Sequence, residues 1–163
     1  MNQSKEYSFT YTELENDSLL NKDDLMLLNK ARAITANAYA PYSNFFVGAA
    51  ALLANKEIVT STNQENASFP VGICAERTLL STITAVYGAI AIDTLAISYI
   101  NQKTKESNHP VSPCGICRQS LIEYQNRVHK PIRLILAGMQ GKVIIINDAS
   151  FLLPLNFAWK DML

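Results

Sequence analysis

The residue types best suited to chemistry are three cysteines and one glutamate, which lie in two short stretches of the chain. Cys74 and Glu76 belong to Cys-Ala-Glu-Arg, and Cys114 and Cys117 belong to Pro-Cys-Gly-Ile-Cys. Three thiolates can hold a zinc ion and leave its fourth coordination position open to water. A carboxylate beside such a site can take a proton from the water and return protons to a substrate. The two stretches therefore predict metal-dependent hydrolysis, with zinc on the cysteines and Glu76 as the proton carrier.

The charge of this site is the reason to include Arg77 in it. Three thiolates around Zn²⁺ leave a net negative charge, which weakens the pull of the metal on a bound water compared with neutral histidine ligands. Arg77 lies three residues after Cys74 and can donate a hydrogen bond to a sulfur, which would tune the ligands. The alternative is a solvated helix residue in a surface ion pair.

Each of these residues also has a simpler interpretation. The helix dipole alone favours a glutamate in a first helical turn, and C-x-x-C also occurs as a redox motif. A purely structural zinc site takes four ligands. His109 could supply the fourth, although we expect both His109 and His129 to be solvated. The combination of C-x-E with P-C-x-x-C is more specific than either part, because it is the signature of zinc deaminases.

The elements that must position these residues are predicted from periodicity and from helix boundaries. Tyr7, Phe9 and Tyr11 alternate with polar residues and indicate a short N-terminal strand. A helix capped by Asp17 or Ser18 is expected to run to about residue 40, before Pro41. Further helices are expected over 74–88 and 114–128, and strands over 46–53, 58–62, 94–100, 132–137 and 143–147.

This order of elements predicts a three-layer α/β/α sandwich with a mixed five-stranded sheet, plus an N-terminal strand extension. We expect a single domain over 1–163, with 1–17 as the extension. Each cysteine-bearing helix lies in a strand-helix-strand crossover. If both crossovers are right-handed and adjacent, both helix starts lie at the carboxyl ends of the strands. The two cysteine stretches would then face each other across one edge of the sheet.

Bulk properties narrow the class of protein. The 163 residues have a formal net charge of zero and no basic block, which argues against a nucleic-acid partner. No segment approaches the ~20 apolar residues of a membrane span, and the polar N-terminus lacks a signal-peptide core, so we expect a cytoplasmic protein. Charged residues are 17%, below the ~25% usual for soluble domains, which permits a self-associating surface.

Three motifs together closely resemble cytidine deaminase of the small homotetrameric class. They are Asn63-Gln-Glu65-Asn66, Cys74-Ala-Glu76-Arg77 and Ser112-Pro-Cys114-Gly-Ile-Cys117-Arg118-Gln119. The stretch from Tyr42 to Ala50 and the ending Leu152-Leu153-Pro154 are also similar to that family. The resemblance covers about residues 25 to 160.

The resemblance implies zinc on Cys74, Cys114 and Cys117, and Glu76 as proton shuttle. It implies that Asn63 and Glu65 bind the ribose 3′-hydroxyl. It also implies that substrate-binding residues include Phe45 and Ala75, and Phe157, which would reach a neighbouring subunit's site. The simpler alternatives are turn residues for Asn63 and Glu65, and plain core for Phe45.

The activity implied is zinc-dependent hydrolytic deamination of cytidine, and of deoxycytidine, to uridine or deoxyuridine and ammonia in pyrimidine salvage. The implied partners are a small nucleoside substrate and copies of the same chain, as a homotetramer or alternatively a homodimer. A deaminase of a related cytosine nucleoside such as blasticidin S remains an alternative. So do a non-catalytic zinc-stabilised binding module and a thiol oxidoreductase.

Two departures from the family are visible. Phe69 stands where members often have tyrosine, which removes a hydroxyl. The region before about Asp17 and the loop at 103–110 look longer than in the shortest members.

Overall fold

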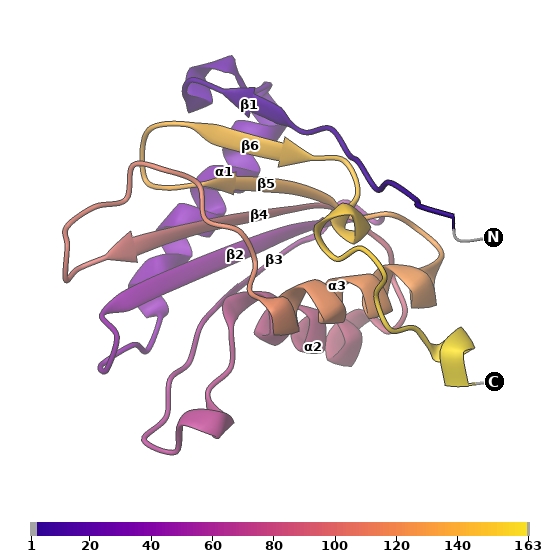
Figure 1. Ribbon diagram of the computed structural model, residues 1–163. Helices are drawn as coiled ribbons and strands as arrows, with labels where there is room; N and C mark the ends of the chain where they lie inside the picture. The colour runs from indigo at the N-terminus through magenta and orange to yellow at the C-terminus, as the bar shows by residue number, and fades with distance from the viewer. Residues whose placement is uncertain (1–2, 163) are drawn as a thin grey trace.

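The apolar runs of the chain form one mixed sheet, which Figure 1 shows in the computed structural model. The structure describes residues 3–162, and this part contains a six-stranded sheet in the order β1-β6-β5-β4-β2-β3. Its strands are β1 (Thr12–Leu14), β2 (Phe45–Leu53), β3 (Ile58–Thr62), β4 (Ile92–Asn101), β5 (Arg133–Ala137) and β6 (Val143–Ile146). Strands β4 and β5 pair in parallel, and the other neighbours are antiparallel.

Three helices cover the two faces of this sheet: α1 (Lys22–Ile34), α2 (Ala75–Tyr87) and α3 (Gly115–Val128). Because side chains alternate across a strand, neighbouring residues of β2 enter different cores. Ala50 packs in a core with α1, whereas Ala49 and Ala51 pack in a core with α2 and α3. Figure 1 shows α1 behind the sheet and α2 and α3 together on the other side. The predicted three-layer α/β/α sandwich is therefore confirmed.

The sheet has one strand more than the five predicted for the domain, because the N-terminal extension joins it. Strand β1 pairs with β6 through Thr12–Leu14, slightly later than the alternation at 7–11 indicated. The aromatic residues before β1 do not pair in the sheet but pack on the domain instead: the Phe9 ring lies on Phe151, with centroids 5.8 Å apart.

Helix α1 is shorter than the predicted helix at both ends. Asn21 caps it by accepting a hydrogen bond from the backbone N–H of Asp24 at 2.9 Å, while Asn16 caps a separate short turn before it. A 3₁₀ turn over Thr35–Asn37 then follows its last residue. The helix is tied to the sheet by Arg133, whose two terminal nitrogens each donate to a carboxylate oxygen of Asp24 at 2.7 Å.

The two crossovers differ in a way that the sequence does not reveal. Helix α3 connects the adjacent parallel strands β4 and β5, as expected. Helix α2 connects β3 to β4, although β2 lies between these two strands, which no pattern in the sequence indicated. The two crossovers share β4 and are therefore adjacent to each other. Both β3 and β4 nevertheless run in the same direction, since each is antiparallel to β2. The starts of α2 and α3 therefore still follow the same edge of the sheet.

Within residues 3–162, no helix has both the length and the apolar character that crossing a bilayer requires.

Gly48 sets how closely α1 approaches the sheet. A Cβ atom at this position would lie 2.1 Å from the carbonyl oxygen of Ala31 and 2.8 Å from Cγ2 of Ile34. We predict that Gly48→Ala lowers the free energy of unfolding by about 3 kcal/mol, because backbone atoms of α1 must move.

Urea unfolding of the zinc-loaded protein measures this effect. Gly115→Ala is the control, since its Cβ would meet nothing within 4 Å, and we expect it to change stability by less than about 1 kcal/mol. A Gly48→Ala variant as stable as the control would contradict the proposed close contact.

Candidate active site

The sulfur atoms of the three cysteines lie together at the starts of two helices. Cys74 is the N-cap of α2, Cys114 is the N-cap of α3, and Cys117 lies in the first turn of α3. The Sγ–Sγ distances are 3.8 Å from Cys74 to Cys114 and 3.4 Å from Cys114 to Cys117. All three ligand atoms lie within 4.8 Å of one another. Three sulfurs on a tetrahedral zinc lie about 3.8 Å apart, so this spacing fits zinc with little rearrangement.

The surroundings favour thiolate at Cys74. Its hydrogen bond with the Cys117 thiol lowers the pKa of Cys74 to about 6, against the opposing effect of burial. The same contact with Cys74 is the main cause that raises the pKa of Cys117. One sulfur is thus ready as a ligand at neutral pH, and metal binding would displace the protons of the other two thiols. The N-terminal ends of both helix dipoles act in the same direction.

Arg77 affects the sulfurs through its charge. It makes a smaller contribution that lowers the pKa of Cys74. Among the described residues, the hydrogen bonds to cysteine sulfurs come from other cysteines and none comes from Arg77. In one chain, its side chain is half-buried beside a groove between α2 and α3.

Glu76 is a buried carboxyl group next to these sulfurs. It is only 5% exposed, although it lies in the first turn of α2 where an ordinary helix glutamate would be solvated. Burial raises the pKa of Glu76, and hydrogen bonds with its own backbone N–H and with Cys117 oppose this only in part. A carboxyl group in such surroundings can hold and release a proton nearer to neutral pH, as general acid-base chemistry requires.

A cavity of about 490 Å³ opens directly onto Cys74, Cys114 and Glu76. Its volume is in the range of small-molecule sites. A hollow of about 590 Å³ lies between α2 and α3, but none of the described residues that line it is a cysteine. Chemistry rather than size therefore identifies the candidate site.

Two polar residues at the end of β3 close one side of this cavity. Asn63 accepts a hydrogen bond from the Val47 backbone N–H at 2.7 Å and donates to the Phe45 carbonyl at 2.9 Å. These two bonds fix the orientation of the Asn63 amide, and the amide keeps one N–H donor and one lone pair free to bind another group.

Glu65 lies two residues after Asn63 and lines the same cavity. It accepts from the backbone N–H groups of Tyr42 at 2.9 Å and Ser43 at 3.3 Å. Although partial burial pushes its pKa upward, hydrogen bonds from the Ser43 side chain and from these N–H groups hold the pKa of Glu65 below its usual value. The residue is thus a fixed carboxylate at the cavity wall.

Most of the residues expected to bind a substrate line the cavity, but one does not. Phe45 and Ala75 contribute to its wall together with Asn63 and Glu65. Phe157 lies in the C-terminal tail with its side chain 59% exposed, and its carbonyl accepts a hydrogen bond from Gln119 at 2.9 Å. Within a single chain the structure does not bring Phe157 to the cavity.

Several cavity residues were missed from the sequence: Ser43, Val47, Ile97, Val111 and Ser112. Val111 and Ser112 immediately precede Pro-Cys-Gly-Ile-Cys, so their place in the chain could have indicated them. Ile97 and Val47 are apolar strand residues without any local sign of a cavity.

Comparisons with known proteins point to one family. A family model described as the cytidine and deoxycytidylate deaminase zinc-binding region matches residues 21–130. The chain is 36% identical to the cytidine deaminase of Halalkalibacterium halodurans over 140 residues, which are 86% of this chain and 98% of that protein. It is 38% identical to the cytidine deaminase of Mycoplasma genitalium over 104 residues, 64% of this chain and 75% of that protein.

Solved structures give the same result. The crystal structure of cytidine deaminase from Burkholderia pseudomallei has a TM-score of 0.70 and 33% sequence identity, and the match covers 85% of this chain and all of that chain. That of cytidine deaminase from Mycobacterium tuberculosis has a TM-score of 0.65 and 30% identity, covering 85% of this chain and 99% of that one.

Removing one sulfur tests the metal centre. We predict that Cys114→Ala, purified in parallel with the wild type, retains less than about one tenth of the wild-type zinc, because two thiolates are too few for a stable site. Elemental analysis of the dialysed proteins gives the zinc content. Ser120→Ala on the same helix is the control and keeps its zinc. Full zinc occupancy in Cys114→Ala would show that the ligand set is different.

Proposed function

Since this chain belongs to the cytidine and deoxycytidylate deaminase family, we propose that it is the deaminase of free cytidine and 2′-deoxycytidine. The products are uridine or deoxyuridine and ammonia. The observation that carries the proposal is the single cavity onto which Cys74, Cys114 and the buried carboxyl group of Glu76 all open.

The residues that would hold zinc are Cys74, Cys114 and Cys117. The spacing of their sulfurs and the lowered pKa of Cys74 both support this assignment. Zinc bound there would polarise a water molecule and lower its pKa, so that a nucleophile is available at neutral pH. The charge of Arg77 and the two helix dipoles would offset part of the negative charge of three thiolates.

Glu76 carries the protons of the reaction. It takes a proton from the attacking water and delivers it to N3 of the cytosine ring, which makes C4 more electrophilic. After the new C–O bond has formed at C4, Glu76 takes the remaining proton of that oxygen and gives it to the amino group. The C4–N bond then breaks, ammonia leaves, and N3 keeps its proton in the uridine product. The raised pKa of Glu76 suits a group that must both accept and donate.

The base would lie between the aromatic wall at Phe45 and the start of α2. Ala75 lines the cavity there, and its small side chain leaves room for a planar ring. The Phe45 ring offers a face for stacking, which is favourable for any pyrimidine.

Asn63 and Glu65 would bind the sugar through its 3′-hydroxyl. An amide and a carboxylate two residues apart on an extended segment can point to the same side and grip one hydroxyl group. Because such a grip does not involve the 2′ position, both ribose and deoxyribose would be accepted. The physiological role that follows is pyrimidine salvage in the cytoplasm.

The proposed assembly is a homotetramer, with a homodimer as the alternative. The tail supports self-association, since Leu155, Phe157 and Trp159 expose more than half of their surface in one chain. In the assembly Phe157 would reach the cavity of a neighbouring subunit. Light scattering coupled to size exclusion measures the assembly state directly.

A first prediction concerns Glu76. Glu76→Gln keeps the shape of the side chain but cannot move protons, so we expect kcat for cytidine to fall by at least about 100-fold while zinc content and fold are unchanged. Loss of cytidine absorbance in the ultraviolet measures turnover. Near-normal turnover in this variant would contradict the shuttle role, and wild-type turnover of blasticidin S but not of cytidine would contradict the substrate.

A second prediction concerns the sugar. Glu65→Ala removes the proposed acceptor for the 3′-hydroxyl, so we expect kcat/KM for cytidine to fall by about 10- to 100-fold. For 3′-deoxycytidine, which lacks this hydroxyl, the same substitution should have much less effect. Equal losses for both substrates would show that Glu65 supports the fold of its loop rather than the substrate.

A further inference from the structure

Tyr99 lies directly behind the aromatic wall of the cavity. It is 1% exposed and lies two residues after Ile97 on β4, so both side chains point to the same face of the sheet. Its ring stacks on the ring of Phe45, with centroids 4.8 Å apart and an angle of 17° between the planes. Phe45 and Ile97 line the cavity, so the position of the wall depends on the buried ring behind it.

The hydroxyl group of Tyr99 connects this wall to the long loop at 102–112. It lies 3.2 Å from Nδ1 and 3.3 Å from Nε2 of His109, whose ring stands edge-on to the tyrosine ring. His109 is exposed on its other side, and its Nδ1 also lies 3.2 Å from the side-chain oxygen of Asn108. Leaving the hydroxyl of a buried tyrosine without a partner costs about 1–3 kcal/mol, which favours the loop position that keeps this contact.

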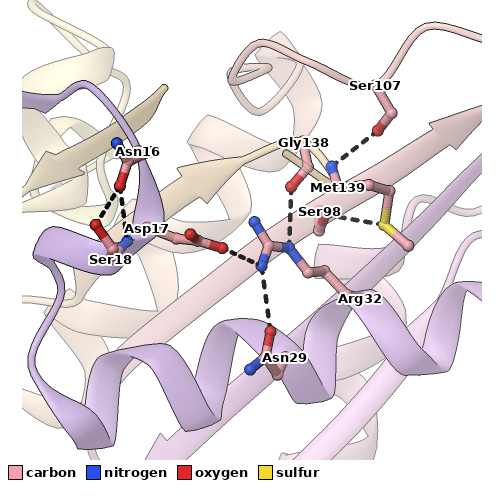
Figure 2. A network of polar contacts seen from close by, with 9 residues as sticks. All are labelled: Asn16, Asp17, Ser18, Asn29, Arg32, Ser98, Ser107, Gly138 and Met139. Atoms are coloured by element: carbon pink, nitrogen blue, oxygen red, sulfur yellow. Dashed lines mark hydrogen bonds and ion pairs between the residues drawn. The ribbon is translucent and has the colours of Figure 1, made fainter. Parts of the chain in front are cut away.

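A second set of hydrogen bonds, made by Ser107, also fixes the position of this loop. The Ser107 hydroxyl donates to the Tyr99 carbonyl and accepts from the backbone N–H of Met139 at 3.0 Å. Figure 2 shows Ser107 facing Met139, while Arg32 holds the neighbouring carbonyl of Gly138 at 3.1 Å. A Cβ on Gly138 would lie 2.3 Å from the Ser107 carbonyl oxygen, so the loop can pack this closely against the turn only because residue 138 is glycine.

The loop leads directly into the site. Val111 and Ser112 at its end line the cavity, and Cys114 follows two residues later. His109 therefore lies two residues before the cavity wall, and its contact with Tyr99 joins the two sides of that wall: Phe45 on β2 and Val111 before α3.

We propose that Tyr99 and His109 are positioning residues that hold the base-binding wall in place before substrate enters. This rests on the proposed function in so far as the occupant is a pyrimidine nucleoside. A wall that is already ordered saves the entropy of ordering it on binding, so the pair acts on affinity. The sulfurs and Glu76 are held by α2 and α3 rather than by this contact, so the chemical step is largely independent of it.

Tyr99→Phe is the direct test, because it keeps the stacked ring and removes only the hydroxyl. The expected result is a KM for cytidine raised about tenfold, which corresponds to the loss of one hydrogen bond, with kcat within about twofold of the wild type. His109→Ala should give the same change, and the double variant should be no worse than either single one.

Tyr124→Phe is the matched control. Tyr124 lies on α3, is also buried, at 4% exposure, and does not line the cavity. Its hydroxyl donates to the Ile90 carbonyl at 2.7 Å. Both substitutions should lower thermal stability, but only Tyr99→Phe should change KM. An active Tyr99→Phe enzyme with the wild-type KM, or an equal KM change in Tyr124→Phe, would overturn the proposal.

Amide hydrogen exchange gives a readout that does not depend on turnover. Tyr99→Phe should speed exchange in the segment 102–112 at least about fivefold relative to the wild type, since the loop loses one of its anchors, whereas Tyr124→Phe should leave that segment unchanged. Unchanged exchange there in Tyr99→Phe would refute the positioning role. If the wild type failed to deaminate cytidine, the proposed function would be wrong, and the exchange measurement would still test the positioning role of Tyr99 and His109.

Discussion

Two helix starts held side by side at one edge of the sheet are the constraint on which the rest of the structure depends. Cys74 caps α2 and Cys114 caps α3, and their sulfurs lie 3.8 Å apart. Because β3 and β4 run in the same direction, the segments that follow them reach the same edge, and the helices pack against one shared core there. Distant parts of the chain thus present three sulfurs to one point, while the helix that contains Glu76 buries its carboxyl beside them.

Local signals in the sequence were enough to predict the bounds of the strands and helices around this edge. The apolar run ending at Leu53, the β-branched residues after it and Gly88 at the end of α2 marked their elements to within about two residues. The start of α1 was placed too early, because Asn16 and Asn21 both cap turns and the sequence does not say which cap begins the helix. The place of β2 between β3 and β4 was not predicted either. A hairpin can join a sheet by either of its strands, and only side-chain packing across the whole domain decides between them.

The candidate site divides in the same way. Its reactive groups belong to short motifs with fixed spacing, so Cys74, Glu76, Cys114 and Cys117 could be proposed from the sequence alone. The wall around them is built from single residues of several elements, such as Ile97 and Val111, which have no pattern of their own. His109 is exposed, as expected, but its ring also lies within hydrogen-bond distance of the hydroxyl of the buried Tyr99. Contacts of this kind arise from the path of a long loop, which local propensity does not determine.

The ligand set of the metal is the central claim, and a zinc K-edge X-ray absorption spectrum of the purified wild-type protein tests it most directly. We expect a first shell of three sulfur neighbours at about 2.3 Å and one oxygen or nitrogen neighbour at about 2.0 Å. A first shell with four sulfur neighbours, or with fewer than three, would contradict this ligand set. So would protein purified without zinc that does not take up one equivalent of the metal.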